Sequence, residues 1–307
     1  MSMKFDDIIK KVSSLEMKKV SVAAAQDEAV LEAVIEAKKR GIADAILVGD
    51  AAKMQEIADA RGFDISSFEI IDEPDMMEAA LKAVKLAHDG KVDMYMKGLA
   101  DSKTFLKSIL DKEVGLRTGS ALSHVCVFEV PGIEQLLFLT DVAFMTYPTL
   151  EDKVSIIKNT IPVAKACGVE VPKVAPLAAV EVVNPKMPCT LEAAELVKMN
   201  EEGTITDCII DGPLSLDLAI DAEAAKHKGA TDRKIQGDAD ILLFPDIHAG
   251  NLVYKMMVRM DDIKNGCILT GTKVPAILTS RSDTFETKVN SIALAAVVAE
   301  ELKKNAQ

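Results

Sequence analysis

Short runs of aliphatic, often β-branched, residues alternate along the first hundred positions with stretches in which apolar residues recur every three or four positions. The runs predict strands at 20–24, 45–48, 68–71 and 92–96, and the stretches between them predict helices at 27–39, 51–61 and 75–87. Asp27, Asp50 and Asp75 stand at or near the helix starts, where capping chemistry favours them. This alternation is typical of βαβ units and predicts an α/β fold with a parallel sheet covered by helices on both faces.

The rhythm changes after Ser123, where two extended runs, 124–130 and 135–140, flank a Pro-Gly turn and predict a hairpin. A long amphipathic helix is expected at 150–166. Further strands are predicted at 173–179, 207–210, 240–244, 267–270 and 276–279, and further helices at 189–199, 215–226, 250–259 and 283–304. The chain has no repeat and no flexible linker, so a second domain would be joined without a tether.

Composition excludes several classes of protein. The 307 residues are 49% apolar and 27% charged, which is enough for one large core or two smaller ones. The net charge of −12, the absence of Trp and the presence of only three Tyr argue against a general nucleic-acid binder. Apolar runs stay far below the ~20 residues of a membrane helix, and the charged N-terminal stretch does not resemble a signal peptide. We therefore expect a cytoplasmic protein without a membrane segment.

Polar residues that directly follow predicted strands are the first candidates for a binding site, because open α/β sheets bind ligands at the carboxyl ends of their strands. Lys97 and Gly98 follow one such strand, and backbone amides there, with Lys97 or Lys103, would suit a phosphate. From the segment alone, an ordinary turn capped by Asp101 or Ser102 is the favoured interpretation.

Three further strand ends carry acids. Asp141 and Asp211 each follow an apolar run and would either orient a ligand or cap the next helix. The segment 237–251 places two acids before a buried strand and Asp246, His248 and Asn251 after it. So many polar groups in one segment favour a binding role over packing.

An arginine at a helix start marks the fifth segment, 278–283, which contains Ser280, Arg281 and Asp283. Arginine is unfavourable beside the positive end of a helix, so its presence in an acidic chain favours bidentate recognition of phosphate or stabilisation of an oxyanion. A salt bridge to Asp283 is the simpler alternative.

Several familiar motifs are missing from the sequence. The segment 266–273 has the glycine spacing of a P-loop but carries Thr before its Lys, and no Gly-x-Gly-x-x-Gly occurs. His124 and His248 remain candidate site residues, but no metal-ligand spacing links them. Cys126 and Cys267 lie within predicted strands and are expected to be core residues rather than nucleophiles.

Taken together, these segments resemble the phosphate acyltransferases of the phosphotransacetylase and phosphotransbutyrylase group along nearly the whole chain. The resemblance rests on the order and spacing of 96–99, 139–141, 212–220, 237–243, 245–251, 278–283 and 291–294. The chain length and the segments 246–251 and 146–153 look closer to butyryl-transferring than to acetyl-transferring members.

The resemblance implies a two-domain α/β/α enzyme of isopropylmalate-dehydrogenase-like architecture with mostly parallel sheets and its active site in the interdomain cleft. Residues 1–139 together with 268–307 would form a discontinuous first domain, and residues 140–267 the second. The reaction would be reversible transfer of a butyryl group between coenzyme A and inorganic phosphate, by direct attack in a ternary complex. The resemblance further implies a homodimer or larger homo-oligomer, a place in butanoate metabolism, and no metal or tightly bound cofactor, with coenzyme A as a substrate.

Residue roles are carried over position by position. Ser280 and Arg281 match the family's Ser-Arg pair, so hydrogen bonding is assigned to Ser280 and charge stabilisation to Arg281. Acetyl-transferring relatives carry a proposed basic aspartate seven residues after that serine, where this chain has Thr287. Asp283, Glu286 and Asp246 are therefore only candidates for the base. The expected catalytic residues are Ser280, Arg281 and Asp283, and the expected substrate-binding residues are Lys97, Gly98, Thr104, Arg117, Asp141, Asp246, His248 and Asn251.

Other functions stay open at this stage. Phe144, Met145 and Tyr147 would either bound a four-carbon acyl pocket or pack in the core. The nearest alternative function is phosphate acetyl transfer, and a non-catalytic acyl-CoA-binding protein is a second. A decarboxylating dehydrogenase of the same architecture is disfavoured, because the sequence has no acidic metal cluster with matching basic residues.

Overall fold

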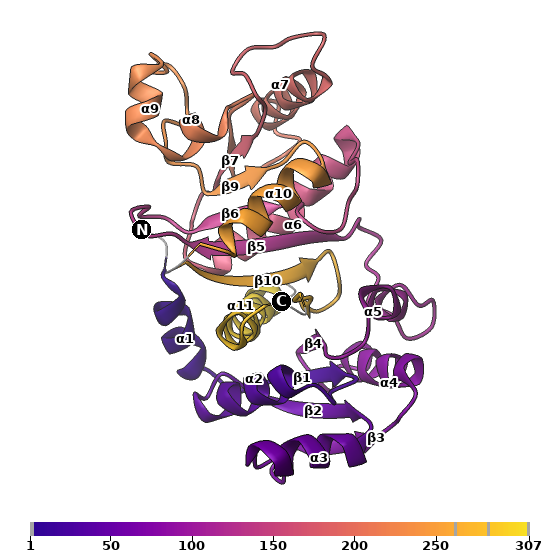
Figure 1. Ribbon diagram of the computed structural model, residues 1–307. Coiled ribbons are helices and arrows are strands. Elements are labelled where there is room, and N and C mark those ends of the chain that lie inside the picture. Colours follow the sequence, from indigo (N-terminus) through magenta and orange to yellow (C-terminus); the bar gives the residue numbers. More distant parts are fainter. Residues whose placement is uncertain (1–2, 261–262, 281–282, 306–307) are drawn as a thin grey trace. The chain divides into compact units, whose positions relative to one another are not determined.

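The computed structural model of the chain describes residues 3–260, 263–280 and 283–305 and shows a mixed α/β fold (Figure 1). The chain divides into two compact units. Unit 1 consists of Met1–Lys4 and Ala121–Asn265, and unit 2 of Phe5–Ser120 and Gly266–Gln307.

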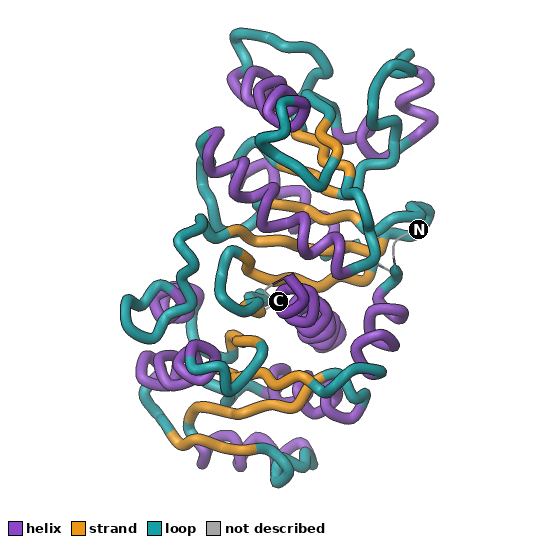
Figure 2. Tube along the Cα trace, turned by 180° about the vertical axis from the view of Figure 1, so that it is seen from behind, coloured by secondary structure: helices purple, strands orange, loops and turns teal. Residues whose placement is uncertain are grey.

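Unit 2 contains a sheet in the order β3-β2-β1-β4-β11-β10. All neighbouring pairs are parallel except β10 and β11, which are antiparallel. The strands are β1 (Lys18–Ala23), β2 (Ala43–Gly49), β3 (Glu69–Asp72), β4 (Met94–Lys97), β10 (Lys264–Thr270) and β11 (Ala276–Ile277). The helices are α1 (Phe5–Ser13), α2 (Glu28–Lys39), α3 (Ala51–Arg61), α4 (Met76–His88), α5 (Ser102–Ile109) and α11 (Phe285–Asn305). Helices α1, α2 and α11 pack together, and α4 packs on α5, so helices cover both faces (Figure 2).

The expected helix caps of unit 2 are confirmed. The side chain of Asp27 accepts a hydrogen bond from Val30 N, and Asp50 and Asp75 accept equivalent bonds from the first turns of α3 and α4. Each bond satisfies a backbone amide that has no partner within its helix. Local sequence therefore fixes where these helices begin.

The interior of unit 2 includes one polar aromatic side chain, that of Tyr95 on β4. Its ring is fully buried and stacks on Phe105, with ring centroids 4.5 Å apart. The hydroxyl lies 2.8 Å from Ser108 Oγ and donates to Ala80 O, so burial leaves no unpaired polar atom there. Burial raises the pKa of this phenol well above its usual value.

Unit 1 contains strands in the order β5-β6-β9-β7-β8. The expected hairpin is confirmed, because β5 (Ser123–Glu129) and β6 (Leu137–Thr140) pair antiparallel. The remaining strands, β7 (Lys173–Pro176), β8 (Ile209–Ile210) and β9 (Ile241–Leu243), pair in parallel with their neighbours, and β9 also pairs in parallel with β6. The helices are α6 (Leu150–Ala166), α7 (Pro188–Glu201), α8 (Leu216–Ile220), α9 (Ala222–His227) and α10 (Ile247–Met257). Helices α6 and α10 lie on opposite faces (Figures 1 and 2).

One predicted helix of unit 1 is interrupted. The sequence predicts a continuous helix at 215–226, whereas the structure ends α8 at Ile220 and starts α9 at Ala222. Between them Asp221 is extended, with φ −129° and ψ 111°, and its side chain accepts hydrogen bonds from Glu223 N and Ala224 N. Aspartate favours this capping role over a helix interior, which explains the break.

The unit boundaries differ from the expected domain boundaries. We expected the first domain to end at 139, within the second strand of the hairpin, whereas the compact units divide between Ser120 and Ala121. The strand β6 stays with its hairpin partner β5 because the two share backbone hydrogen bonds. The second expected boundary, 267/268, lies two residues after the unit boundary at Asn265. Among the described residues, no helix is long and apolar enough to cross a membrane.

Two acids hold the amino ends of β7 and β9. Asp240 Oδ2 accepts a hydrogen bond of 2.8 Å from Lys173 N, and the Lys173 ammonium pairs with Asp238. Burial raises the pKa of Asp240 from 3.8 to about 6. The hydrogen bond from Lys173 N lowers this pKa, and the negative charge of Asp238 raises it further. These acids lie at the strand end opposite to Asp246 and act structurally.

The raised pKa of Asp240 predicts a pH-dependent stability. The folded chain keeps this proton up to about pH 6, whereas the unfolded chain loses it near pH 3.8, so the folded state binds more protons between these values. This group's contribution to the free energy of unfolding therefore falls by about 3 kcal/mol as pH rises through that window. Urea unfolding at pH 4 to 7 should show a smaller decline for Asp240→Asn than for wild type. Parallel curves would contradict the assignment.

Candidate active site

A cavity of about 220 Å³ opens at the carboxyl end of β4 in unit 2. Its walls come from four places: the start of α2, the β4–α5 loop, the segment after β11, and the first turn of α11. The lining residues are Asp27, Glu28, Ala29, Val30, Lys97, Gly98, Leu99, Thr279, Ser280 and Lys288. The cavity thus brings together three of the expected site residues, Lys97, Gly98 and Ser280.

Lys97 is the last residue of β4 and is only 5% exposed. Its Nζ donates hydrogen bonds of 3.1 Å to Gly98 O and to Ala100 O. These two contacts with carbonyl oxygens orient the ammonium group. A buried cation is therefore held at the cavity wall.

Position 98 must be a glycine because the β1–α2 turn and the β4–α5 turn come into close contact there. Gly98 N donates to Ala23 O, and Leu99 N donates to Ala24 O. A Cβ atom at Gly98 would lie 2.3 Å from Ala24 O and 2.7 Å from Ala23 O, which no side chain tolerates. Ala24 itself has φ +56°, a left-handed conformation that costs free energy in any residue with a side chain. The loop geometry thus brings the β1–α2 turn against the β4–α5 turn.

The amino end of the twelve-residue helix α2 faces the cavity, since its first residues line the wall. A helix amino end carries partial positive charge and exposes backbone N–H groups. Two acids also belong to the lining: Glu28 pairs with Arg61 at 2.7 Å, whereas Asp27 caps α2 through Val30 N at 3.0 Å and keeps its negative charge. The helix amino end and the ammonium group of Lys97 favour an anionic ligand beside this one carboxylate.

The Ser280 segment is tied together by Asp283. Asp283 Oδ2 accepts a hydrogen bond of 2.7 Å from Ser280 N, and Asp283 N donates to Ser280 O. The carboxylate expected to be catalytic therefore positions the serine. Arg281, the other expected catalytic residue, lies outside the described residues.

Lys288 is a site residue that sequence reasoning missed. It lies in the first turn of α11, is 3% exposed, and donates from Nζ to Asp283 O at 2.8 Å. Its position one turn before the buried Ile292 places a charged residue on the apolar face of its helix. That pattern was the available signal, since a lysine is seldom fully buried without a reason.

Two other expected binding residues of unit 2 do not line the cavity. Thr104 lies in the first turn of α5, where Thr104 N donates to the cap residue Asp101 at 2.8 Å. Arg117 is exposed and forms an isolated β-bridge with Thr272. Their assignment as substrate contacts stays a prediction.

The four expected binding residues of unit 1 gather at the carboxyl ends of β6 and β9. Asp141 directly follows β6 and is 2% exposed. Its carboxylate accepts hydrogen bonds from His124 N, Ala143 N and Phe144 N at 2.8, 2.9 and 2.7 Å. Asp141 therefore shapes the loop that leads away from β6.

The other three residues belong to the start of α10. Asp246 caps this helix by accepting from His248 N and Ala249 N. His248 Nε2 lies 2.9 Å from the hydroxyl of Tyr147, and Asn251 Nδ2 donates to Val142 O at 2.9 Å. These contacts bring the β6 loop and the first turn of α10 side by side, and Tyr147 is 70% exposed there.

Each candidate for the general base has a partner. Asp283 binds Ser280 N and Asp246 caps α10, as described above. Glu286 pairs with Arg40, with Oε1 3.0 Å from Nη2. At the position of the acetyl enzymes' aspartate, the hydroxyl of Thr287 lies 3.0 Å from that of Thr284. Hydroxyl groups do not act as bases near neutral pH, so Thr287 does not replace that aspartate.

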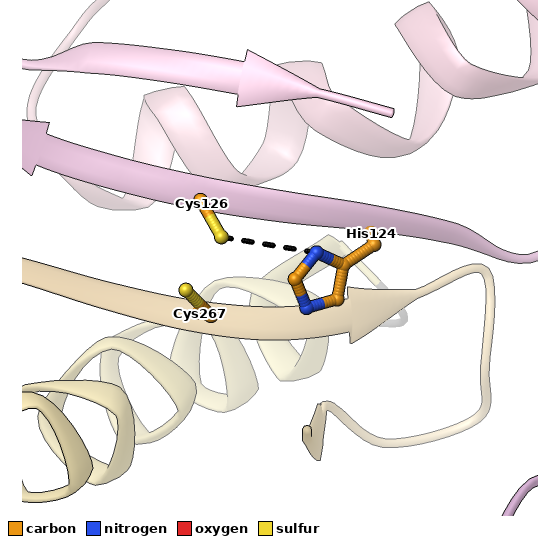
Figure 3. Close-up of side chains that lie close together, drawn as sticks. All are labelled: His124, Cys126 and Cys267. Carbon is orange, nitrogen blue, oxygen red and sulfur yellow. Dashed lines mark hydrogen bonds between the residues drawn. The ribbon is translucent and has the colours of Figure 1, made fainter. Parts of the chain in front are cut away.

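His124 and Cys126, both on β5, are buried among the strands of unit 1. His124 Nδ1 lies 3.8 Å from Cys126 Sγ (Figure 3). His124 is 2% exposed and Cys126 is fully buried, as is Cys267 on β10. The expectation that both cysteines are core residues is confirmed by their burial.

Comparison with known proteins identifies relatives along nearly the whole chain. The model of the family described as phosphate acetyl/butaryl transferase matches residues 4–80 and 73–296. The chain is 59% identical to the phosphate butyryltransferase of Clostridium acetobutylicum over 96% of this chain and 98% of that protein. It is 55% identical to the phosphate butyryltransferase of Clostridium beijerinckii over 97% and 99%, respectively. The crystal structure of a branched-chain phosphotransacylase from Enterococcus faecalis V583 is similar with a TM-score of 0.82 and 34% identity, over 92% of this chain and 99% of that one. The chain therefore belongs to the phosphate acetyl/butaryl transferase family.

Proposed function

We propose that the chain is an acyltransferase that moves a butyryl group reversibly between coenzyme A and inorganic phosphate. The observation that supports this best is the cavity of unit 2, where two buried lysines, a serine and a helix amino end converge in a protein of net charge −12. Such a cavity suits a small dianion. The choice of a butyryl group is supported by the two Clostridium relatives, which are phosphate butyryltransferases.

The chemistry needs few protein groups. A phosphate oxygen attacks the thioester carbonyl carbon, a C–O bond forms, and the carbonyl oxygen becomes an oxyanion. The C–S bond then breaks, coenzyme A leaves as a thiolate that takes up a proton, and butyryl phosphate remains. The protein must hold phosphate at the thioester and stabilise charge as it develops.

The residues of unit 2 fit these tasks. Lys97 and the amides at the start of α2 hold the phosphate, and Ser280 supplies a hydroxyl to the reacting carbonyl or phosphate. Arg281, by its charge and its place next to Ser280, stabilises the oxyanion. In unit 1, Asp246, His248 and Asn251 are the proposed substrate contacts, and Phe144, Met145 and Tyr147 the proposed wall of the acyl pocket.

The proposal carries four further statements. Coenzyme A serves as a substrate rather than a resident cofactor, no metal takes part in the chemical step, and the enzyme works in the cytoplasm. The chain also forms a homo-oligomer, for which the apolar residues Leu252 and Met256, 72% and 69% exposed on one face of α10, give support. Sedimentation equilibrium of the purified protein should give at least twice the 33.0 kDa of one chain, and a mass of one chain would refute this statement.

The function is tested by phosphate-dependent release of coenzyme A from acetyl-, propionyl-, butyryl- and valeryl-CoA. We expect the highest kcat/KM with butyryl-CoA and a loss of about tenfold in Ser280→Ala, the effect of one hydrogen bond. Ser155→Ala, on the exposed side of α6, is the matched control. A preference for acetyl-CoA would replace the acyl group in the proposal, and no turnover by folded protein would favour an acyl-CoA-binding protein.

A further inference from the structure

We propose that Lys288 is a direct ligand of a substrate phosphate group and holds it in the cavity of unit 2 together with Lys97. This inference rests on the proposed function and extends it, since neither the sequence pattern nor the resemblance assigns a role to Lys288. Lys288 directly follows Thr287, the position at which the resemblance places an aspartate in acetyl-transferring relatives.

The geometry places two ammonium groups at one cavity. Lys97 comes from the end of β4 and Lys288 from the first turn of α11, and both line the same 220 Å³ space. They are 5% and 3% exposed, respectively. Two positive charges buried around one small space repel each other, and a bound anion offsets that repulsion.

Lys288 keeps donors for such an anion. An ammonium group carries three N–H donors, and among the described residues only Asp283 O accepts one, at 2.8 Å. No carboxylate within the described ranges lies at salt-bridge distance from Lys288. Of the two acids in the lining, Glu28 pairs with Arg61, and Asp27, which keeps its charge, caps α2 through Val30 N and forms no salt bridge with Lys288. Lys288 is therefore held in place by a neutral carbonyl while its charge is left for a ligand.

A phosphate group is the anion that this lining fits. A point charge such as an ammonium group binds phosphate well, and the amides at the start of α2 add further donors. The cavity is far larger than the ~15 Å³ that one water needs, so a tetrahedral anion has room. Both substrates carry phosphate, because inorganic phosphate is the nucleophile and coenzyme A bears phosphate groups of its own.

Lys288 also lies next to the position where this chain lacks the aspartate of the acetyl-transferring relatives. Its neighbour Thr287 stands where acetyl enzymes carry the proposed base, and the Thr287 hydroxyl is bound to Thr284. A cation next to that position stabilises negative charge on phosphate rather than removing a proton. In this chain, then, the first turn of α11 contributes to phosphate binding.

Lys288→Met removes the ammonium group, and Lys288→Arg keeps a positive charge at the same position. Lys304→Met is the matched control, because Lys304 is exposed near the end of the same helix. Binding of inorganic phosphate to the purified protein is measured by titration calorimetry without acyl-CoA, so the result does not depend on turnover. Binding of coenzyme A and of 3′-dephospho-coenzyme A is measured in the same way, and urea unfolding reports the stability of each variant.

We expect Lys288→Met to weaken phosphate binding about tenfold or more, the effect of one charge-assisted hydrogen bond, with partial recovery in Lys288→Arg. The steady-state KM for phosphate should rise in parallel while the KM for butyryl-CoA stays unchanged. A second outcome is that Lys288→Met weakens the binding of coenzyme A and leaves the binding of 3′-dephospho-coenzyme A unchanged. In that case the phosphate that Lys288 binds is the 3′-phosphate of coenzyme A. Unchanged binding of all three ligands, with only the unfolding midpoint lowered, would overturn the proposal and leave Lys288 as a structural tie to Asp283.

Discussion

Asp141→Ala is expected to lower the free energy of unfolding by about 4 kcal/mol. The carboxylate accepts hydrogen bonds from three backbone amides, His124 N, Ala143 N and Phe144 N, at 2.7 to 2.9 Å. Alanine would leave these donors without an acceptor, and the amide of His124 is buried where water does not easily replace it. A lost acceptor costs about 1 to 3 kcal/mol for each buried donor. Urea unfolding measures the difference.

The matched variant is Asp141→Asn, which keeps one side-chain oxygen and replaces the other by an NH₂ group. It should retain the bonds to Ala143 N and Phe144 N and lose the bond to His124 N, because two donors would then face each other. We therefore expect about half the destabilisation. If both variants unfold like wild type, Asp141 does not hold the loop, and its assignment as a substrate contact gains support instead.

Gly98→Ala is expected to disrupt both stability and phosphate binding. The new Cβ would lie 2.3 Å from Ala24 O and 2.7 Å from Ala23 O, so the β1–α2 turn and the β4–α5 turn must move apart. That movement strains or breaks the bonds from Gly98 N and Leu99 N, and we expect a loss of about 4 kcal/mol in the free energy of unfolding. The KM for phosphate should rise as well, because the same turns form the cavity wall.

Gly62→Ala separates loss of stability from damage to the cavity. Gly62 ends α3 with φ +68°, and no atom lies within 4 Å of an added Cβ. Alanine there costs about 1 to 2 kcal/mol through backbone strain alone. Its KM for phosphate should equal that of wild type. A rise in KM in Gly62→Ala as large as that in Gly98→Ala would show that kinetic defects follow stability, not cavity shape.

Much of the fold could be predicted from the sequence because its signals are local. The helix at 150–166 matches α6, and the caps at Asp27, Asp50 and Asp75 mark helix starts through bonds within four residues. The hairpin around Pro131 likewise follows from turn chemistry. Asp221, by contrast, breaks a predicted helix because a capping aspartate and a helical one look alike in a periodic pattern.

The site was harder to predict because it depends on contacts between distant segments. Lys97, Gly98 and Ser280 were found through their places at strand ends, and the cavity brings them together. Lys288 was missed, although its place one turn before Ile292 on the apolar face of α11 was a signal, and the packing of α11 shows that its side chain is buried. In the segment 237–251, Asp246 was chosen as a site residue because it follows the predicted strand, and the structure places it at the carboxyl end of β9 with Asp240 at the opposite end.

The central claim is that phosphate, not water, receives the acyl group. The most direct measurement incubates the purified protein with butyryl-CoA and inorganic phosphate, and follows acyl phosphate by ³¹P NMR and free coenzyme A by thiol titration. We expect the two products to appear in equal amounts, and we expect added coenzyme A and butyryl phosphate to run the reaction backwards. Release of coenzyme A at the same rate without phosphate, with no acyl phosphate formed, would contradict it.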